Sequence, residues 1–272
     1  MGKYSMELGL KDLPSKESYV RDPRFWTLPF GGNNSGSAFK ATIRFIVDYA
    51  YSKKAMIKTL NHNFMVGAHI YNNICRKTIQ GNSCPLCDLA SRYYASNDPA
   101  EKELAKKIYA KPKFISNVYI VSDLNNEKNT GKVLLFSFGK QIYDIITRAM
   151  NGDLDSGENP IEIFDPYEGA NFIVRKESKI QSPPSYTSSK FLSVSKLKPT
   201  DEEIGAILSN TINLDTFIDP SAMPTLDDVE AFVRSFEGKS NIQDIVETNQ
   251  INAKESDVEP TTKDLDDILN SQ

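Results

Sequence analysis

The sequence has no long hydrophobic run and few cysteines. Its longest apolar stretches are only a few residues, such as Val133 to Phe136, whereas a membrane-spanning helix needs about 20. No basic segment followed by an apolar stretch marks a secretion signal, so we expect neither a membrane span nor export. Three cysteines cannot all pair, which argues against a secreted disulfide framework and predicts a reducing, cytosolic setting.

The sequence also lacks a phosphate-cradling loop. Residues 31–36 are rich in glycine and asparagine, but they are not followed by the Gly-Lys-Ser/Thr that such a loop requires. We therefore interpret this stretch as a turn between two strands, at residues 27–30 and 38–48, rather than as a nucleotide site.

The net charge of −4 conceals two parts of opposite sign. Residues 1–200 hold 28 Lys and Arg against 19 Asp and Glu, a net charge of +9, while residues 201–272 hold 4 against 17, a net charge of −13. A basic domain attracts polyanions because it neutralises phosphates and releases their counterions. An acidic segment on the same chain would compete for that basic surface. The alternative is that the acidic segment is only a solvated tail.

Short strands with a few inserted helices account for most of the first 200 residues. Apolar segments bounded by turn residues predict further strands at 114–122, 132–138, 161–164 and 170–176. Helical spacing predicts helices at 88–95, 99–109 and 141–150. This mainly β (α+β) pattern suits a small β-barrel better than a doubly wound sheet.

We expect four parts along the chain. Residues 1–24 form a polar N-terminal arm, and residues 25–200 form the core. Residues 201–240 are a helical segment, with helices at 201–208 and 226–236, that packs on the core or follows it. Residues 241–272 are an acidic, disordered tail. The tail contains an apolar and acidic stretch that resembles a docking peptide, formed by Asp264, Leu265, Asp266, Asp267, Ile268 and Leu269.

The strongest local signal is a cluster of metal-binding residue types. Cys75, Cys84 and Cys87 fall within thirteen positions. Structural zinc takes four thiolate or imidazole ligands, and a Cys-x-x-Cys turn supplies two of them from one knuckle. His62 or His69 would complete the set, and spacing favours His62 only weakly. We therefore predict one structural Zn²⁺ in a subdomain at about residues 58–112, against the alternative of three buried free thiols.

A zinc enzyme acting on nucleic acid fits these residues less well. Nucleobase deaminases combine their cysteines with an upstream His-x-Glu, whereas His62 is followed by Asn63 and Phe64. A fourth protein ligand also closes the position that a catalytic water would occupy. A thioredoxin-like use of Cys84 and Cys87 would need a βαβ context that the pattern does not predict. We expect no catalytic residue.

Cations and aromatic rings alternate directly after the metal cluster. Single-stranded nucleic acid is held in this way, because cations follow the phosphates while bases stack on rings without regard to sequence. The alternative is that the rings belong to the core and the lysines to a solvated helix face. The residues concerned are Arg92, Tyr93, Tyr94, Lys106, Lys107, Tyr109, Lys111, Lys113 and Phe114.

Several motifs in a fixed order give the chain a family resemblance. They are Ala41-Thr42-Ile43-Arg44-Phe45, Asn61-His62-Asn63-Phe64, Cys84-Pro85-Leu86-Cys87, Gly131-Lys132-Val133 through Phe138-Gly139-Lys140, Tyr167-Glu168-Gly169-Ala170-Asn171-Phe172, Ser189-Lys190-Phe191-Leu192 and Asp264 through Leu269. In these motifs the chain resembles the helix-destabilising, single-stranded-DNA-binding proteins of T4-type bacteriophages. The resemblance runs from about residue 26 to residue 192 and returns at the last residues.

The resemblance implies an OB-fold core with a zinc subdomain in which His62 is the fourth ligand. It implies a protein of the infected bacterial cytoplasm that coats and protects single-stranded DNA, destabilises duplex and serves DNA replication, recombination and repair. It implies self-association along the DNA through arm residues Lys3 and Ser5, and contacts of the acidic tail with phage replication and recombination proteins. The DNA cleft would contain Arg44, Tyr94, Tyr109, Lys111, Lys113, Phe114, Phe136 and Tyr186.

The chain departs from the family pattern at three places. Its arm has no tight basic cluster, so the resemblance does not extend to strong cooperativity. Ile115 stands where the family has a tryptophan, and Pro183-Pro184 replace a ring. Fewer stacking platforms predict weaker binding per site. A zinc-dependent nucleic-acid-processing enzyme and an adaptor that works through its acidic tail are the alternative functions.

Overall fold

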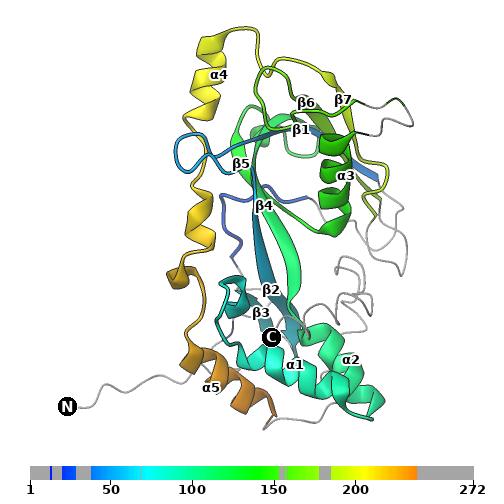
Figure 1. Ribbon diagram of the computed structural model, residues 1–272, viewed down its shortest axis with the longest axis vertical. Helices are drawn as coiled ribbons and strands as arrows, with labels where there is room; N and C mark the ends of the chain where they lie inside the picture. Colours follow the sequence, from blue (N-terminus) through cyan, green and yellow to red (C-terminus); the bar gives the residue numbers. More distant parts are fainter. Residues whose placement is uncertain are drawn as a thin grey trace, which may run out of the picture. The chain divides into compact units, whose positions relative to one another are not determined.

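The structure is a computed structural model that describes residues 13, 20–28, 38–67, 69–152, 157, 159–177 and 185–237 (Figure 1). Lys3 and Ser5, the predicted turn at 31–36 and the predicted tail with its docking peptide lie outside these residues. Within the described part of the chain, no helix is both long and apolar enough to cross a lipid bilayer.

The chain divides into two compact units, each built from segments that are distant in the sequence. The described part of unit 1 comes mainly from residues 59–112 and 217–237, and unit 2 draws on residues 21–58 and 113–216. The strands are β1 Ala38–Ile46, β2 Ile57–Val66, β3 His69–Ile74, β4 Lys111–Asp123, β5 Val133–Phe138, β6 Ala170–Glu177 and β7 Lys190–Val194. The helices are α1 Pro85–Ala95, α2 Pro99–Ile108, α3 Lys140–Asn151, α4 Asp201–Leu208 and α5 Leu226–Glu237.

Unit 2 contains an antiparallel sheet in the order β5-β4-β1-β6-β7. The long strand β4 pairs with both β1 and β5, and β6 pairs with both β1 and β7. Helix α3 lies in the connection from β5 to β6. Among the described residues no pairing joins β5 to β7, so the sheet is open. The predicted mainly β architecture with inserted helices is confirmed.

One side of this sheet is filled by aromatic rings. Ile43 and Phe45 of β1 are fully buried there, because alternate side chains of a strand share a face. The Phe45 ring lies 5.8 Å from Phe138 and 5.6 Å from Phe172. On the other side, α4 covers a smaller apolar cluster. Its buried members are Ile46, Tyr119, Leu197, Ile204 and Leu208.

Unit 1 combines the β2–β3 hairpin with three helices. His62, Phe64 and Val66 are buried on one face of β2. Helix α5 joins this core although it follows α2 by more than 100 residues. The ring of Phe232 lies 4.3 Å from that of Tyr71 and is fully buried. The 217–237 segment therefore completes the core of unit 1.

Two of the predicted strands are wrong in the described residues. Thr27 and Leu28 form no strand, and residues 161–164 are irregular. The apolar residues at 161–164 belong to a loop, in which Ile163 is fully buried. Asp165 then shapes that loop by accepting hydrogen bonds from the backbone N–H groups of Tyr167 and Glu168. Strands β2 and β7 were not predicted.

Candidate metal centre and nucleic-acid interface

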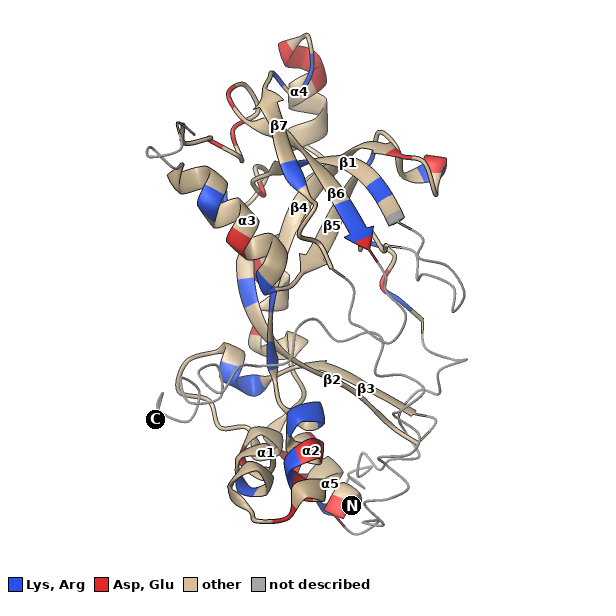
Figure 2. Cartoon of the chain, turned by 90° about the vertical axis from the view of Figure 1, so that its right-hand side faces the viewer, with Lys and Arg blue, Asp and Glu red and all other residues tan. Residues whose placement is uncertain are grey.

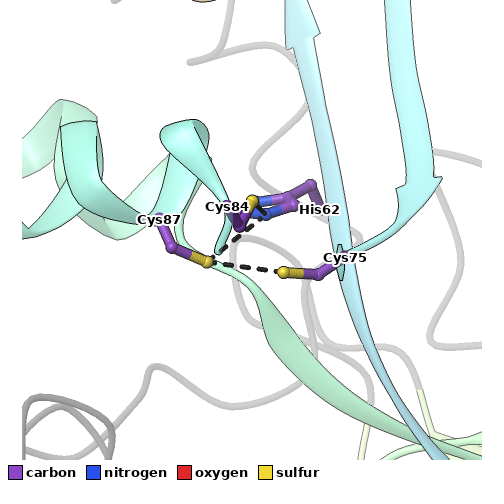
Figure 3. A group of neighbouring side chains, drawn as sticks. All are labelled: His62, Cys75, Cys84 and Cys87. Carbon is purple, nitrogen blue, oxygen red and sulfur yellow. Dashed lines mark hydrogen bonds between the residues drawn. The ribbon is translucent and has the colours of Figure 1, made fainter. Parts of the chain in front are cut away.

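Four metal-binding side chains come together inside unit 1 (Figure 3). The ligand atoms of His62, Cys75, Cys84 and Cys87 all lie within 4.8 Å of one another. The Sγ atoms of Cys75 and Cys87 are 3.4 Å apart, and His62 Nε2 lies 3.4 Å from Cys84 Sγ and 3.6 Å from Cys87 Sγ. These are the four residues that spacing and the resemblance predicted.

Two of the separations between these atoms match the edges of a zinc tetrahedron, and the S···S separation of 3.4 Å between Cys75 and Cys87 is shorter than such an edge. Zinc–sulfur bonds of about 2.3 Å and zinc–nitrogen bonds of about 2.0–2.1 Å at tetrahedral angles give S···S separations of about 3.8 Å and S···N separations of about 3.5 Å. The two S···N distances of 3.4 and 3.6 Å lie close to that value. Three thiols and one imidazole are also the donor set typical of a structural zinc site. The residues therefore fit one zinc ion.

The start of helix α1 positions two of the thiols. Pro85 occupies the first turn of the helix, where its fixed φ angle favours helix initiation, and Cys84 is the N-cap residue. Cys87 lies in the first turn. Both sulfur atoms therefore lie near the positive end of the helix dipole, which stabilises thiolates.

Backbone contacts fix the other two ligands. His62 Nδ1 lies 2.7 Å from the carbonyl oxygen of Ile108, and donation of its proton to that carbonyl leaves Nε2 free to bind a metal. Cys75 Sγ accepts a hydrogen bond from Lys77 N–H at 3.4 Å. His69 is absent from the cluster, because its Nδ1 contacts the carbonyl of Leu13 at 2.9 Å. Sequence reasoning did not identify the Ile108 contact, which involves a backbone atom and leaves no residue signature.

In the metal-free cluster, a positively charged His62 and a negatively charged Cys84 are favoured. Burial lowers the pKa of His62, but hydrogen bonds to Cys75 and Cys84 and their negative charge outweigh it and raise the pKa to about 10. Hydrogen bonds from Cys75 and Cys87 lower the pKa of Cys84 well below its usual range. Hydrogen bonds with Cys75 and Cys84 raise the pKa of Cys87. A cation at the centre of the cluster would stabilise the thiolates directly and displace their protons.

The geometry leaves the centre closed. The four residues are between 1% and 5% exposed, and each contributes one ligand atom. A catalytic zinc site keeps one coordination position for water or substrate, whereas a structural site fills all four with protein ligands. The arrangement is therefore one that holds a fold together.

The eight predicted DNA contacts differ in their exposure. Arg44, Tyr109, Phe114 and Phe136 are buried, whereas Tyr94, Lys111, Lys113 and Tyr186 are partly exposed. Three of the eight belong to unit 1 and five to unit 2. Their contact with DNA stays a prediction for all eight.

Arg44 supports a loop from the interior of unit 2. It is fully buried, and its Nη2 donates to the carbonyl oxygens of Asp165 and Ser195, both at 2.9 Å. A side chain at Gly169 would place its Cβ 2.8 Å from that Nη2, so only glycine fits there. Burial lowers the pKa of Arg44 to about 10, although the charge of Asp165 opposes this.

The two predicted phenylalanines have their rings in the aromatic core of unit 2. Phe114 stacks on Tyr143 with 4.0 Å between ring centroids and 8° between planes. Phe136 packs edge-on against Trp26 at 5.1 Å and contacts Phe138 at 5.3 Å. In this structure both rings are therefore covered by protein side chains.

Comparison with known proteins identifies one family. The profile described as "gp32 DNA binding protein like" matches residues 37–236. The single-stranded DNA-binding proteins of Enterobacteria phage T4 and Enterobacteria phage T2 are each 32% identical to the chain over 173 residues. The matched part is 63% of this chain and 56% of each relative, so it spans little more than half the length of these curated relatives.

Proposed function

The chain belongs to the family of gp32-like DNA-binding proteins, and from this premise we propose that it binds single-stranded DNA without regard to sequence and performs no catalysis. The observation that carries the proposal is the family match over residues 37–236. The basic charge of residues 1–200, a net +9, supports it, because phosphate neutralisation supplies most of such binding.

We propose that unit 2 is a partly open OB-fold. Counted within unit 2, its five strands pair first with second, second with third, first with fourth, and fourth with fifth. Helix α3 lies between the third and fourth. The OB-fold is a five-stranded, partly open barrel, and it binds oligonucleotides through its second and third strands and two loops. The β1–β4 connection, which carries residues 59–112 of unit 1, would be one of those loops, and the β6–β7 connection the other.

The proposed metal is one structural Zn²⁺ held by His62, Cys75, Cys84 and Cys87. When bound, it would stabilise the thiolates and tie β2 to the start of α1. Through the Ile108 carbonyl, His62 also holds the end of α2. That end leads directly into β4 and the predicted contacts Lys111 and Lys113. Metal binding would therefore order the strand that carries these cations.

For the DNA contacts we favour the residues that reach solvent. Lys111 and Lys113 at the start of β4 would neutralise phosphates, and Tyr94 and Tyr186 would offer ring surface to bases. Tyr186 lies in the β6–β7 connection, where its backbone N–H donates to Gln141 Oε1 at 2.9 Å. Arg44 and Phe136 would support the site from within the fold.

The variant Lys111→Gln/Lys113→Gln tests this assignment. Each lost phosphate contact lowers the slope of log K against log salt by about 0.7 for single strands, so the double variant is expected to lose about 1.4. The measurement is a fluorescence titration with oligo-dT at several salt concentrations. Lys102→Gln/Lys128→Gln removes the same charge from two exposed sites and serves as the control. Equal slopes for the two variants would remove Lys111 and Lys113 from the DNA path.

Binding of this kind would destabilise duplex DNA without an energy source. A protein that binds single strands but not duplex shifts the melting equilibrium by mass action. Coating would also protect the strand. We place this activity in the cytoplasm of an infected bacterium, in replication, recombination and repair, with arm residues Lys3 and Ser5 contributing to self-association and the acidic tail recruiting partner proteins.

The tail would also compete with DNA for the basic surface. Residues 241–272 hold 8 Asp and Glu against 2 Lys. Deletion of these residues is therefore expected to raise the affinity for oligo-dT, most strongly at low salt, where screening is weakest. Parallel titrations of the full chain and the deletion variant measure this. Unchanged affinity and unchanged salt dependence would show that the tail does not cover the DNA site.

A further inference from the structure

Three exposed cations form a row across three neighbouring strands of unit 2. Lys40 on β1 is the register partner of Arg175 on β6. Lys190 on β7 is the partner of Ile173, two residues from Arg175. All three side chains are exposed. Figure 2 shows basic residues on each of β1, β6 and β7.

The three side chains lie on the same face of the sheet. On β1, Phe39 and Ala41 face the aromatic core, so Lys40 faces outward. On β6, Phe172 and Val174 face that core, so Arg175 faces outward as well. Adjacent strands are about 4.8 Å apart, so a row across three strands spans about 10 Å.

The ion pairs within the described part of unit 2 do not involve the row. Some cations of unit 2 have a carboxylate partner, as Lys140 has Asp144 at 2.8 Å and Lys196 has Asp201 at 2.7 Å. Within the described part of the chain, Lys40, Arg175 and Lys190 make no ion pair. The nearest acidic residue on the same face of β6 is Glu177, whose carboxylate accepts a hydrogen bond from Ser188 Oγ at 2.5 Å.

The arrangement carries a cost in the free protein. Side chains directly opposite on antiparallel strands have Cβ atoms about 4.5–5.5 Å apart, and like charges there are destabilising. Lys40 and Arg175 are such a pair. Ser189 fixes the neighbouring strand, because its Oγ accepts from Arg175 N–H at 2.9 Å and donates to Arg175 O at 3.2 Å. An anion between the cations would remove the repulsion.

We propose that Lys40, Arg175 and Lys190 form a phosphate-contacting row that guides the single strand across the outer face of β1, β6 and β7. The inference rests on the proposed function and adds a site to it. Strand β6 ends two residues after Arg175 and β7 begins at Lys190, and the connection between them carries Tyr186. The ring of Tyr186 packs against the aromatic core, on the opposite side of the sheet, so the row would hold the phosphates of a different stretch of the strand from the one whose bases reach Tyr186.

The triple variant Lys40→Gln/Arg175→Gln/Lys190→Gln tests the row in the full chain. Its slope of log K against log salt for oligo-dT is expected to fall by about 2, at about 0.7 per phosphate contact. The control Lys53→Gln/Lys102→Gln/Lys128→Gln removes the same net charge from exposed lysines elsewhere and is expected to change the slope far less. Equal slopes for the two triple variants would overturn the row while leaving the proposed function standing. Absence of oligo-dT binding by the unmodified chain would overturn both.

A single variant distinguishes a DNA-contacting row from exposed cations that have no role in binding. Lys40→Glu places opposite charges across β1 and β6, so the melting temperature at low salt is expected to rise while oligo-dT affinity falls. If Lys40→Glu raised the melting temperature but bound oligo-dT no more weakly than Lys128→Glu does, the proposal would be contradicted. If the triple variant instead lost only its binding of an added peptide of residues 241–272, with an unchanged slope for DNA, the row would hold the acidic segment and the DNA proposal would fail.

Discussion

Replacement of Cys87 by serine is expected to abolish metal binding and to unfold unit 1. Cys87 Sγ lies within 3.6 Å of both Cys75 Sγ and His62 Nε2, so its loss opens the tetrahedron. Structural zinc contributes on the order of 10 kcal/mol in small zinc domains. That is as large as the total stability of a typical domain, about 5–15 kcal/mol. Zinc assay by mass spectrometry and thermal unfolding with hydrogen exchange in residues 59–112 measure both effects.

Ser83→Ala is the matched control for this variant. Ser83 is exposed and directly precedes Cys84, and its backbone carbonyl accepts a hydrogen bond from Arg76 Nε at 3.1 Å. It is expected to retain one zinc per chain and unchanged protection. A zinc-free Cys87→Ser protein with wild-type protection in unit 1 would contradict the structural role of the metal.

Phe232→Ala is expected to cost about 3–5 kcal/mol, the usual loss for a buried phenylalanine. Its ring is fully buried and lies 4.3 Å from the ring of Tyr71 and 6.2 Å from that of Phe64. Phe64 follows His62 by two residues on β2. Because α5 completes the core around the metal centre, the loss should appear in unit 1. Denaturant unfolding of the full chain, followed by zinc release, measures it.

Arg234→Ala, on the exposed face of the same helix, is the control for Phe232→Ala. Arg234 makes a 3.7 Å ion pair with Glu230, and such exposed pairs contribute less than about 1 kcal/mol. If Phe232→Ala shifted zinc release no more than Arg234→Ala, α5 would not belong to the core of unit 1.

The sequence predicted which four side chains come together, because few residue types bind zinc. With three cysteines and two histidines in the chain, the open question was His62 or His69. Strand alternation decides it, since His62 shares the buried face of β2 with Phe64. That face could not be assigned from the sequence, because β2 itself was not predicted as a strand.

Aromatic residues were harder to interpret, because base stacking and core packing use the same rings. Phe114 follows two lysines in the sequence, as a ring in a DNA interface would, yet it contacts Tyr143, and the ring of Phe136 contacts Trp26. The packing position of α5 also could not be predicted from the sequence. Its amphipathic pattern shows that one face is buried but does not reveal that Tyr71 is the residue it meets.

The central claim is that this chain binds single strands in preference to duplex. The most direct test titrates the full, zinc-assayed protein against a fluorescent oligo-dT strand and against the matching duplex, each at two salt concentrations. We predict strongly salt-dependent binding to the single strand, much weaker binding to the duplex, and one zinc per chain. Equal affinity for both forms, or no binding to either, would contradict the account. The metal centre would then stabilise a fold whose function is not single-strand binding.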